Sequence, residues 1–220
     1  MHSHEFSAPN IEINDVSVGW KGKAVVSNVS TTLPAGKISV ILGGSGCGKS
    51  TMLRHILGLK PVMTGSIRIG GKEISDILAE SPRFLRSRMG VLFQDGALIS
   101  SLTLGENVAL PLREHTDLGD EVIENVVRIK LSLVGLEDAV ELYPRELSGG
   151  MRKRGGLARA LALDPGVLLC DEPSAGLDPI TAAALDQLLI DLKDALPMTF
   201  VVVTHELPSV FEIADHVVVL

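Results

Sequence analysis

The chain has 220 residues, with 20 Lys and Arg against 27 Asp and Glu, and therefore a formal net charge of −7. Its 45% hydrophobic and 21% charged residues are typical of a packed globular protein and exclude a disordered or collagen-like chain. The negative charge does not favour unaided binding to DNA or RNA, which needs a basic face, so we expect no nucleic-acid partner.

Neither a membrane span nor a secretory signal is visible in the sequence. No run approaches the roughly 18 consecutive apolar residues that cross a bilayer, and residues 1–10 lack a basic start and an apolar centre. Two cysteines, Cys47 and Cys170, make no disulfide framework. We therefore expect a cytosolic protein that works at a membrane only as a peripheral subunit.

Strand and helix patterns alternate from the start of the chain. Residues 1–10 are polar and predicted to be flexible, and alternating apolar residues then predict strands over 11–18 and 25–33. The β-branched apolar run 37–42 predicts a buried strand, which is followed by a glycine-rich loop and a helical pattern over 49–57.

The second half continues the alternation, with a long helical stretch inside it. The remaining predictions are part of a hairpin over 64–71, a strand over 89–93, a helical insertion over about 95–160, strands over 167–170 and 200–203, a helix over 181–196, a short helix and a strand over 217–220. This order predicts an α/β fold with a mostly parallel sheet. The chain stops within the last predicted strand, from which we expect a truncated C-terminal end.

The glycine-rich loop carries the sequence Gly43-Gly-Ser-Gly-Cys-Gly-Lys-Ser50, which fits the P-loop pattern G-x-x-x-x-G-K-[ST] between a strand and a helix. Its glycines allow successive backbone N–H groups to surround phosphate oxygens at the positive end of the helix. Lys49 is predicted to reach the β- and γ-phosphates and Ser50 to bind Mg²⁺. The predicted nucleotide-binding residues here are Gly43, Gly44, Ser45, Gly46, Cys47, Gly48, Lys49, Ser50 and Thr51.

Two consecutive carboxylates, Asp171 and Glu172, end the apolar strand that begins at Val167. Acidic residues at the carboxyl end of a buried strand indicate the ligand side of an α/β sheet. Asp171 is predicted to hold Mg²⁺, mainly through water, and Glu172 to polarise the attacking water.

A second anion site is predicted at Ser148, Gly149 and Gly150, which precede a helix rich in Arg and Ala. Gly155 and Gly156 lie inside that helix, where each costs about 0.5–1 kcal/mol relative to alanine. Close helix packing accounts for one of these two glycines, and the sequence offers no reason for the pair.

In their order along the chain, these motifs resemble those of the ATP-binding cassette (ABC) ATPases, from Ile11 to Leu220. The resemblance implies an α/β P-loop NTPase fold of the RecA-like type with a mostly parallel sheet. It further implies an N-terminal antiparallel β subdomain and an inserted α-helical subdomain at about 95–160, within a single nucleotide-binding domain over 11–220. ATP and Mg²⁺ are the implied ligands, and ATP hydrolysis is the implied reaction.

The resemblance also implies roles for residues that carry no signal alone. Trp20 would stack on adenine, and Gln94 would contact Mg²⁺ or the attacking water. His205 would contact the γ-phosphate, and Asp178 would cross the interface of a head-to-tail homodimer. In that dimer Ser148, Gly149 and Gly150 bind the ATP held by the opposite P-loop. The implied catalytic residues are Lys49, Gln94, Glu172 and His205, and the implied metal ligands are Ser50, Gln94 and Asp171.

Three stretches are similar to a narrower group, the lipid-transporting Mla/Mce-type ATPases: residues 93–116, 147–154 and 203–210. Met151, where most transport ATPases have glutamine, fits the same group. This resemblance implies three partners: an integral-membrane permease, an MCE-domain protein that moves phospholipid or another hydrophobic cargo, and in some members a STAS-domain protein. The implied location is the cytoplasmic face of the inner membrane.

Two alternative functions remain open at this stage. One is a soluble ABC ATPase of iron–sulfur assembly, although such proteins lack the pattern found over 96–116. The other is an ABC importer subunit for a different solute. A nucleotide-gated clamp with little turnover is disfavoured, because Glu172 and His205 supply both catalytic groups.

Overall fold

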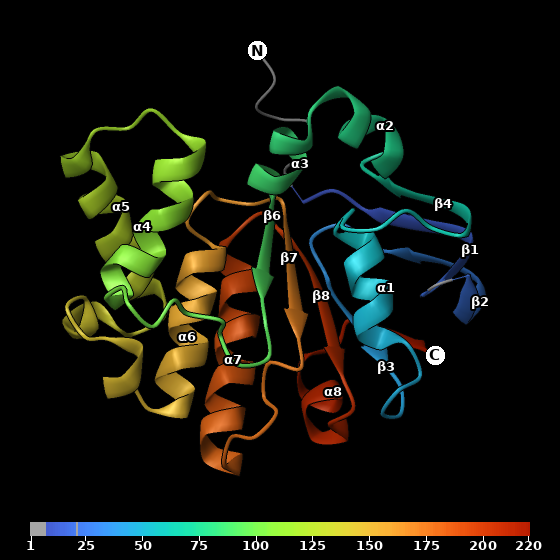
Figure 1. Ribbon diagram of the computed structural model, residues 1–220. Coiled ribbons are helices and arrows are strands. Elements are labelled where there is room, and N and C mark those ends of the chain that lie inside the picture. Colours follow the sequence, from blue (N-terminus) through green and yellow to red (C-terminus); the bar gives the residue numbers. More distant parts are fainter. Residues whose placement is uncertain (1–7, 21) are drawn as a thin grey trace.

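Two β-sheets form the frame of the structure, a computed structural model that describes residues 8–20 and 22–220 (Figure 1). Within these residues, the antiparallel sheet has the order β2-β1-β4-β5 and the parallel sheet the order β6-β7-β8-β3-β9. The predicted α/β class with a mostly parallel sheet is confirmed. Most of the segment predicted to be flexible, residues 1–10, lies outside the described residues.

The strands follow the patterns of the sequence closely. They are β1 (Ile11–Trp20), β2 (Lys23–Leu33), β3 (Ile38–Leu42), β4 (Thr64–Ile69), β5 (Lys72–Glu73), β6 (Met89–Leu92), β7 (Val167–Asp171), β8 (Thr199–Thr204) and β9 (His216–Val219).

Some helices pack against the parallel sheet, and others form the segment that was predicted as a helical insertion. They are α1 (Lys49–Ile56), α2 (Ile74–Glu80), α3 (Pro82–Arg88), α4 (Leu104–His115), α5 (Asp120–Leu133), α6 (Gly149–Ala160), α7 (Pro179–Ala195), α8 (Leu207–Ile213) and the 3₁₀ turns η1 (Glu137–Ala139) and η2 (Pro144–Glu146). Helices α2 and α3 were not predicted, because each has only two turns and no long apolar period. In the described part of the chain, no helix is long and apolar enough to cross a membrane.

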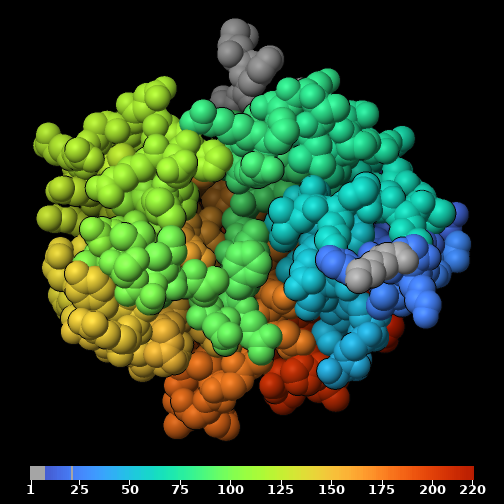
Figure 2. Space-filling model, in the orientation of Figure 1, coloured from blue at the N-terminus to red at the C-terminus, as the bar shows by residue number. Residues whose placement is uncertain are grey.

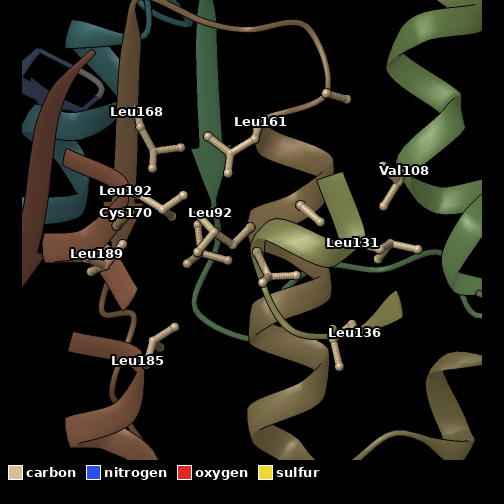
Figure 3. Close-up of a cluster of buried hydrophobic side chains, with 14 of the residues drawn as sticks. Leu92, Val108, Leu131, Leu136, Leu161, Leu168, Cys170, Leu185, Leu189 and Leu192 are labelled. Atoms are coloured by element: carbon tan, nitrogen blue, oxygen red, sulfur yellow. The ribbon is translucent and has the colours of Figure 1, made fainter. Parts of the chain in front are cut away.

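Alternate residues of the central strands pack into two separate cores. Leu168 and Cys170 of β7 face the core shared with α4, α5, α6 and α7, whereas Val167 and Leu169 face the core shared with α1 and the antiparallel sheet. Figure 3 shows the first core, where Leu92, Leu168 and Leu161 lie close together between the sheet and α6. Because helices cover one face and a helix and the second sheet the other, these strands are apolar throughout.

The helical insertion and α3 stand on either side of β6. Figure 2 shows that the surface is hollowed between α4 and α5, in yellow-green, and α3, in teal, with β6 beneath. A groove of about 470 Å³ is lined there by residues of α3, β6, α4 and α6. The groove begins beside the loop that carries Gln94.

The paired glycines of α6 are explained by contacts with the loop after β6. A Cβ on Gly156 would lie 2.7 Å from the carbonyl oxygen of Gly96, and one on Gly155 would lie 2.5 Å from Cδ1 of Leu104. The Arg159 guanidinium then donates hydrogen bonds to the carbonyl oxygens of Gly96 and Ala97, at 3.0 and 2.7 Å. Both glycines therefore serve close packing, and at Gly156 the loop backbone itself is the neighbour.

We predict that Gly156→Ala destabilises the protein, because the added methyl group collides with backbone atoms that cannot rotate away. Overpacking of this kind costs about 1–3 kcal/mol, which exceeds the gain of at most ~1 kcal/mol in helix propensity. The midpoint of thermal unfolding should fall by about 2–6 °C, measured by circular dichroism. Gly149→Ala in the same helix is the matched control, since its nearest neighbour is 3.6 Å away. A midpoint at or above the wild-type value would contradict the packing explanation.

Candidate active site

The carboxyl ends of β3, β7 and β8 lie side by side at one edge of the parallel sheet. Leu42 pairs with Thr204, and Asp171 pairs with Val203. Consequently the loop after Leu42, Asp171 at the end of β7, Glu172 directly after it and His205 after β8 all emerge at the same edge. This is the edge where ligands bind in open α/β sheets.

The loop from Gly43 to Gly48 has the geometry of a phosphate cradle. Gly46 and Gly48 have φ values of +81° and +107°, which favour glycine. A Cβ on Gly48 would lie 2.3 Å from Val26, and one on Gly43 would lie 2.5 Å from the Cys47 sulfur. Helix α1 begins at Lys49 with no side-chain cap and no acidic residue in its first turn. Its first N–H groups and its positive end therefore suit an anion.

Lys49 directs its ammonium group into this loop. The side chain is 6% exposed, and Nζ donates hydrogen bonds to the carbonyl oxygens of Gly43 and Gly44, at 2.8 and 3.1 Å. Nζ also lies 3.5 Å from Oε1 of Glu172. The cation thus connects the glycine loop with the carboxylate that follows β7.

Asp171 and Ser50 form a second contact between the same two segments. The Ser50 hydroxyl donates a hydrogen bond to Oδ1 of Asp171, at 3.0 Å. Burial is the main cause that raises the pKa of Asp171, and the neighbouring Glu172 carboxylate adds to it, against the hydrogen bond from Ser50 and the charges of Arg54 and Lys49. The carboxylate lies where a cation would relieve its desolvation.

Glu172 stands between Lys49 and His205 in an unusual backbone conformation. Its φ is +50°, in the left-handed region that non-glycine residues rarely adopt. Oε2 lies 2.9 Å from Nδ1 of His205 and accepts a longer hydrogen bond, at 3.3 Å, from the backbone N–H of the same residue. Since an ionised carboxylate only accepts, Nδ1 is the donor in this contact. Lys49, Glu172 and His205 therefore form one contiguous cluster.

Gln94 and Trp20 lie outside this cluster. Gln94 is exposed in the turn after β6, and across residues 8–20 and 22–220 no hydrogen bond joins its side chain to Ser50 or Asp171. Trp20 ends β1 and is 53% exposed, and the ammonium group of Lys60 lies over its ring, 2.8 Å from the centroid. One face of the indole is thus covered by a cation, a contact that the sequence did not suggest.

Ser148 and Asp178 are brought together in a second region, built from the N-termini of α6 and α7. The Ser148 hydroxyl accepts a hydrogen bond from the N–H of Met151, and Oδ1 of Asp178 accepts one from the N–H of Thr181, at 3.2 and 3.1 Å. Gly150 packs against Thr181, because a Cβ there would lie 2.5 Å from its methyl group. Each predicted residue thus caps its own helix, and the two helix starts are neighbours.

Sequence reasoning missed a set of buried polar groups behind the active site. The Ser174 hydroxyl donates to Oδ1 of Asp186 at 2.8 Å, and both residues are buried. Lys153 is 5% exposed and donates to backbone carbonyls of the segment that follows Glu172. In the sequence, Lys153 belongs to a run of basic residues that is typical of a solvated helix face, so no local signal could identify it.

The arrangement fits a nucleoside triphosphate with Mg²⁺. The loop has glycines whose N–H groups could surround phosphate, Lys49 has a buried ammonium group, and Ser50 and Asp171 hold adjacent oxygens that could bind a cation. The described residues contain no group of three or more His, Cys, Asp or Glu side chains that could hold a metal ion. Mg²⁺ bound by few protein ligands together with substrate phosphates is consistent with this composition.

The sequence profile of the ABC transporter family matches residues 26–175. The chain belongs to the ABC transporter family. An ABC relative in Mycobacterium tuberculosis strain H37Rv, described as a probable ribonucleotide transport ATP-binding protein, is 44% identical over 94% of this chain. The chain spans only 58% of that relative's length. MlaF of Escherichia coli K12, described as an intermembrane phospholipid transport system ATP-binding protein, is 44% identical over 96% of this chain and 78% of MlaF.

Solved ABC structures share the fold. The cassette MJ0796, in a dimeric post-hydrolysis state bound to ADP and Pi, has a TM-score of 0.85 and 31% identity, covering 96% of this chain and 94% of that one. CbiO1 of Clostridium perfringens has a TM-score of 0.87 and 28% identity, covering 95% of this chain and 83% of that one. The predicted P-loop NTPase fold and the predicted resemblance to Mla-type ATPases are confirmed.

We predict that Asp171→Asn stabilises the nucleotide-free protein at pH 7. Burial raises the pKa of Asp171, so its charged form is disfavoured in the folded state, whereas asparagine keeps an acceptor for Ser50 without the charge. A raised folded pKa means that the wild type loses stability as pH rises from 3.8 through that higher value. The gain in the free energy of unfolding from Asp171→Asn should therefore be constant around neutral pH and shrink on acidification. Urea unfolding at several pH values measures it.

Asp178→Asn is the matched control, and its expected effect on the free energy of unfolding has the opposite sign. Hydrogen bonds from the hydroxyl and N–H of Thr181 lower the pKa of Asp178, so its charge stabilises the fold above pH 3.8 and the stabilisation is lost on acidification. This variant should be less stable than the wild type at pH 7. If Asp171→Asn were also less stable, the charges of Arg54 and Lys49 would outweigh burial at Asp171.

Proposed function

We propose that this chain is the ATP-hydrolysing subunit of an ABC transporter that moves lipid, with residues 11–220 as one nucleotide-binding domain and residues 95–160 as its helical subdomain. The contact of Glu172 with both Lys49 and His205 beside the glycine loop is the observation that carries the proposal. These three groups supply a phosphate-binding cation, a base and a hydrogen-bonding partner at one place.

Binding and hydrolysis follow from the positions of these side chains. The N–H groups of the glycine loop and Lys49 hold the β- and γ-phosphates, and Trp20 stacks on adenine with the ring face that Lys60 leaves free. Glu172 accepts a proton from the attacking water, whose oxygen bonds to the γ-phosphorus as the bond to the ADP oxygen breaks. His205 orients the Glu172 carboxylate through Nδ1 and faces the γ-phosphate.

Ser50 and Asp171 are the proposed Mg²⁺ ligands, and Gln94 joins them when the loop after β6 moves toward the nucleotide. When bound, Mg²⁺ neutralises charge on the β- and γ-phosphates. Asp171 favours such an ion because its buried carboxylate is otherwise poorly compensated. The hydroxyl of Ser50 already lies against Asp171, so both ligands are pre-positioned.

We also propose a head-to-tail homodimer with ATP at its interface. Ser148 caps α6 through the N–H of Met151, and the first turn of the helix holds no acidic residue, so its positive end suits the phosphates of an ATP bound by the opposite P-loop. Asp178 lies next to this helix start and crosses to the partner. MJ0796 was solved as a dimer with ADP and Pi, and its cassette superposes on this chain with a TM-score of 0.85.

The groove beside Gln94 is the proposed contact with an integral-membrane permease. It measures about 470 Å³, and apolar side chains line it together with arginines and one acidic residue, among them Val91, Phe93, Leu110, Arg159 and Glu114. Phe93 is 44% exposed and directly precedes Gln94, so a helix docked there would touch the loop that senses the nucleotide. The proposed location of the subunit is therefore the cytoplasmic face of the inner membrane.

Lipid is the proposed cargo because the chain is 44% identical to MlaF over 210 residues. An MCE-domain protein is the proposed partner of the permease, and a STAS-domain protein a further subunit. The mycobacterial relative, also 44% identical, carries a name that refers to ribonucleotide transport. Since cargo contacts lie in the partner proteins, the identity of those partners distinguishes the two cargoes.

We predict that Glu172→Gln lowers kcat for ATP hydrolysis by about 10²–10⁴-fold, because glutamine cannot accept the proton. ATP binding should persist, so gel filtration with ATP should reveal a stable dimer. Lys49→Ala is the contrasting variant, since loss of the phosphate-binding cation should abolish ATP binding measured by calorimetry. An unchanged kcat in Glu172→Gln would remove Glu172 from its proposed role.

We predict that the tagged full-length protein, isolated from gently solubilised membranes of its native cell, carries a polytopic permease and an MCE-domain protein, identified by mass spectrometry. Lys49→Ala is the control, because a subunit that docks through the groove should be captured without ATP binding. Recovery of a solute-binding protein, or of soluble scaffold proteins alone, would refute the lipid assignment and leave the ATPase mechanism intact.

A further inference from the structure

Lys153 of α6 is buried beneath the active site and, among residues 8–20 and 22–220, has no carboxylate as its direct partner. It is 5% exposed, and Nζ donates hydrogen bonds to the carbonyl oxygens of Pro173 and Ala175, at 2.6 and 2.5 Å. A longer contact, at 3.5 Å, reaches the carbonyl oxygen of Glu172. The three N–H donors of the ammonium group thus face three carbonyls of one short segment.

That segment, residues 172–178, begins with the left-handed conformation of Glu172. The N–H of Glu172 donates to the carbonyl of Val203, at 2.8 Å, which fixes the residue to β8 on one side. On the other side, the chain turns away through hydrogen bonds from the N–H of Ala175 to Glu172 and from the N–H of Leu177 to Ser174, both at 3.2 Å. Because the carbonyls of this turn point at Lys153, its ammonium group compensates a strained backbone.

The charges around Lys153 belong to the loops that carry the catalytic residues. Burial lowers the pKa of Lys153, while the charges of Asp95, Glu172 and Glu206 oppose that effect. Asp95 follows Gln94 in the chain and Glu206 follows His205. Lys153 therefore contacts the turn after β7 and lies within electrostatic range of acidic residues in the loops after β6 and β8.

Lys130 is a buried lysine of the same protein whose charge is paired with a carboxylate. It is also 5% exposed and lies on α5, but its partner is the carboxylate of Asp164. That pair connects α5 to the loop before β7, away from Glu172. Lys153 differs because it binds backbone carbonyls at the catalytic turn.

We propose that Lys153 is a positioning residue that holds the turn 172–175 so that the Glu172 carboxylate points at Lys49 and His205. This inference rests on the proposed ATPase function. Lys153 lies one helical turn after Gly149 and Gly150 on α6, so a displacement of that helix is transmitted to Glu172 through the ammonium group. Lys153 thereby couples two parts of one chain. One is the N-terminus of α6, which would bind the ATP held by the opposite P-loop, and the other is the proposed base, Glu172.

The test compares Lys153→Met with Lys130→Met, which removes the other buried lysine. Lys153→Met should lower kcat for ATP hydrolysis at least tenfold and change KM for ATP less than twofold, because Lys153 does not touch the nucleotide loop. Lys130→Met should leave both constants within twofold of the wild type. A decrease in kcat shared by both variants, or a parallel change in kcat and KM, would overturn the proposal.

A second readout needs no nucleotide. In hydrogen exchange of the nucleotide-free protein, Lys153→Met should raise exchange at least tenfold for the amides of Ala175 and Leu177, whereas Lys130→Met should not. Lys153→Arg, which keeps donors and charge, should retain part of this protection and more activity than Lys153→Met; it also replaces Lys153→Met if that variant fails to fold. Unchanged exchange in Lys153→Met would refute the positioning role.

These outcomes can be separated from a failure of the proposed function. If the wild type does not hydrolyse ATP, or Glu172→Gln retains full kcat, the proposed function fails, whatever the exchange data show. If the wild type is active and Glu172→Gln is not, an unaffected Lys153→Met refutes only the positioning role.

Discussion

The parallel register of β3, β7 and β8 is the constraint on which the candidate site depends. Because Leu42 pairs with Thr204 and Asp171 pairs with Val203, the glycine loop, the two carboxylates and His205 emerge at one edge. A one-residue slip would also exchange the two cores, since alternate residues of each strand face different ones. The same burial that stabilises the sheet thus fixes the distances between Lys49, Glu172 and His205.

Helix α6 connects this edge to the rest of the molecule through three kinds of contact. Its start neighbours the start of α7, its glycine pair packs on the loop after β6, and Lys153 binds the turn after β7. The backbone contact between Gly156 and Gly96 leaves no side chain that could adapt to a shift. A displacement of α6 would therefore displace the loop that carries Gln94, and in the proposed function nucleotide binding reaches the neighbouring groove by this route.

The strands and the glycine loop were predictable from the sequence because their signals are local. The apolar runs before Gly43 and Asp171 lie in buried strands, and a P-loop between strand and helix specifies its own geometry. Lys153 and the pair Gly155 and Gly156 were not explained, because their partners lie far away in the chain and basic residues or glycines in a helix carry no directional signal. Helices α2 and α3 were not predicted, because the apolar pattern of such short helices is weak.

At Glu172 the left-handed backbone conformation and the proposed role of the carboxylate favour different residues. Judged by folding alone, glycine or asparagine is the better residue at a φ of +50°, since neither suffers the crowding that a longer side chain meets there. A protein under selection for stability only would drift away from glutamate here. With Glu172 as the proposed base, folding free energy is given up at this position for chemistry, and variants here that gain thermal resistance should lose turnover.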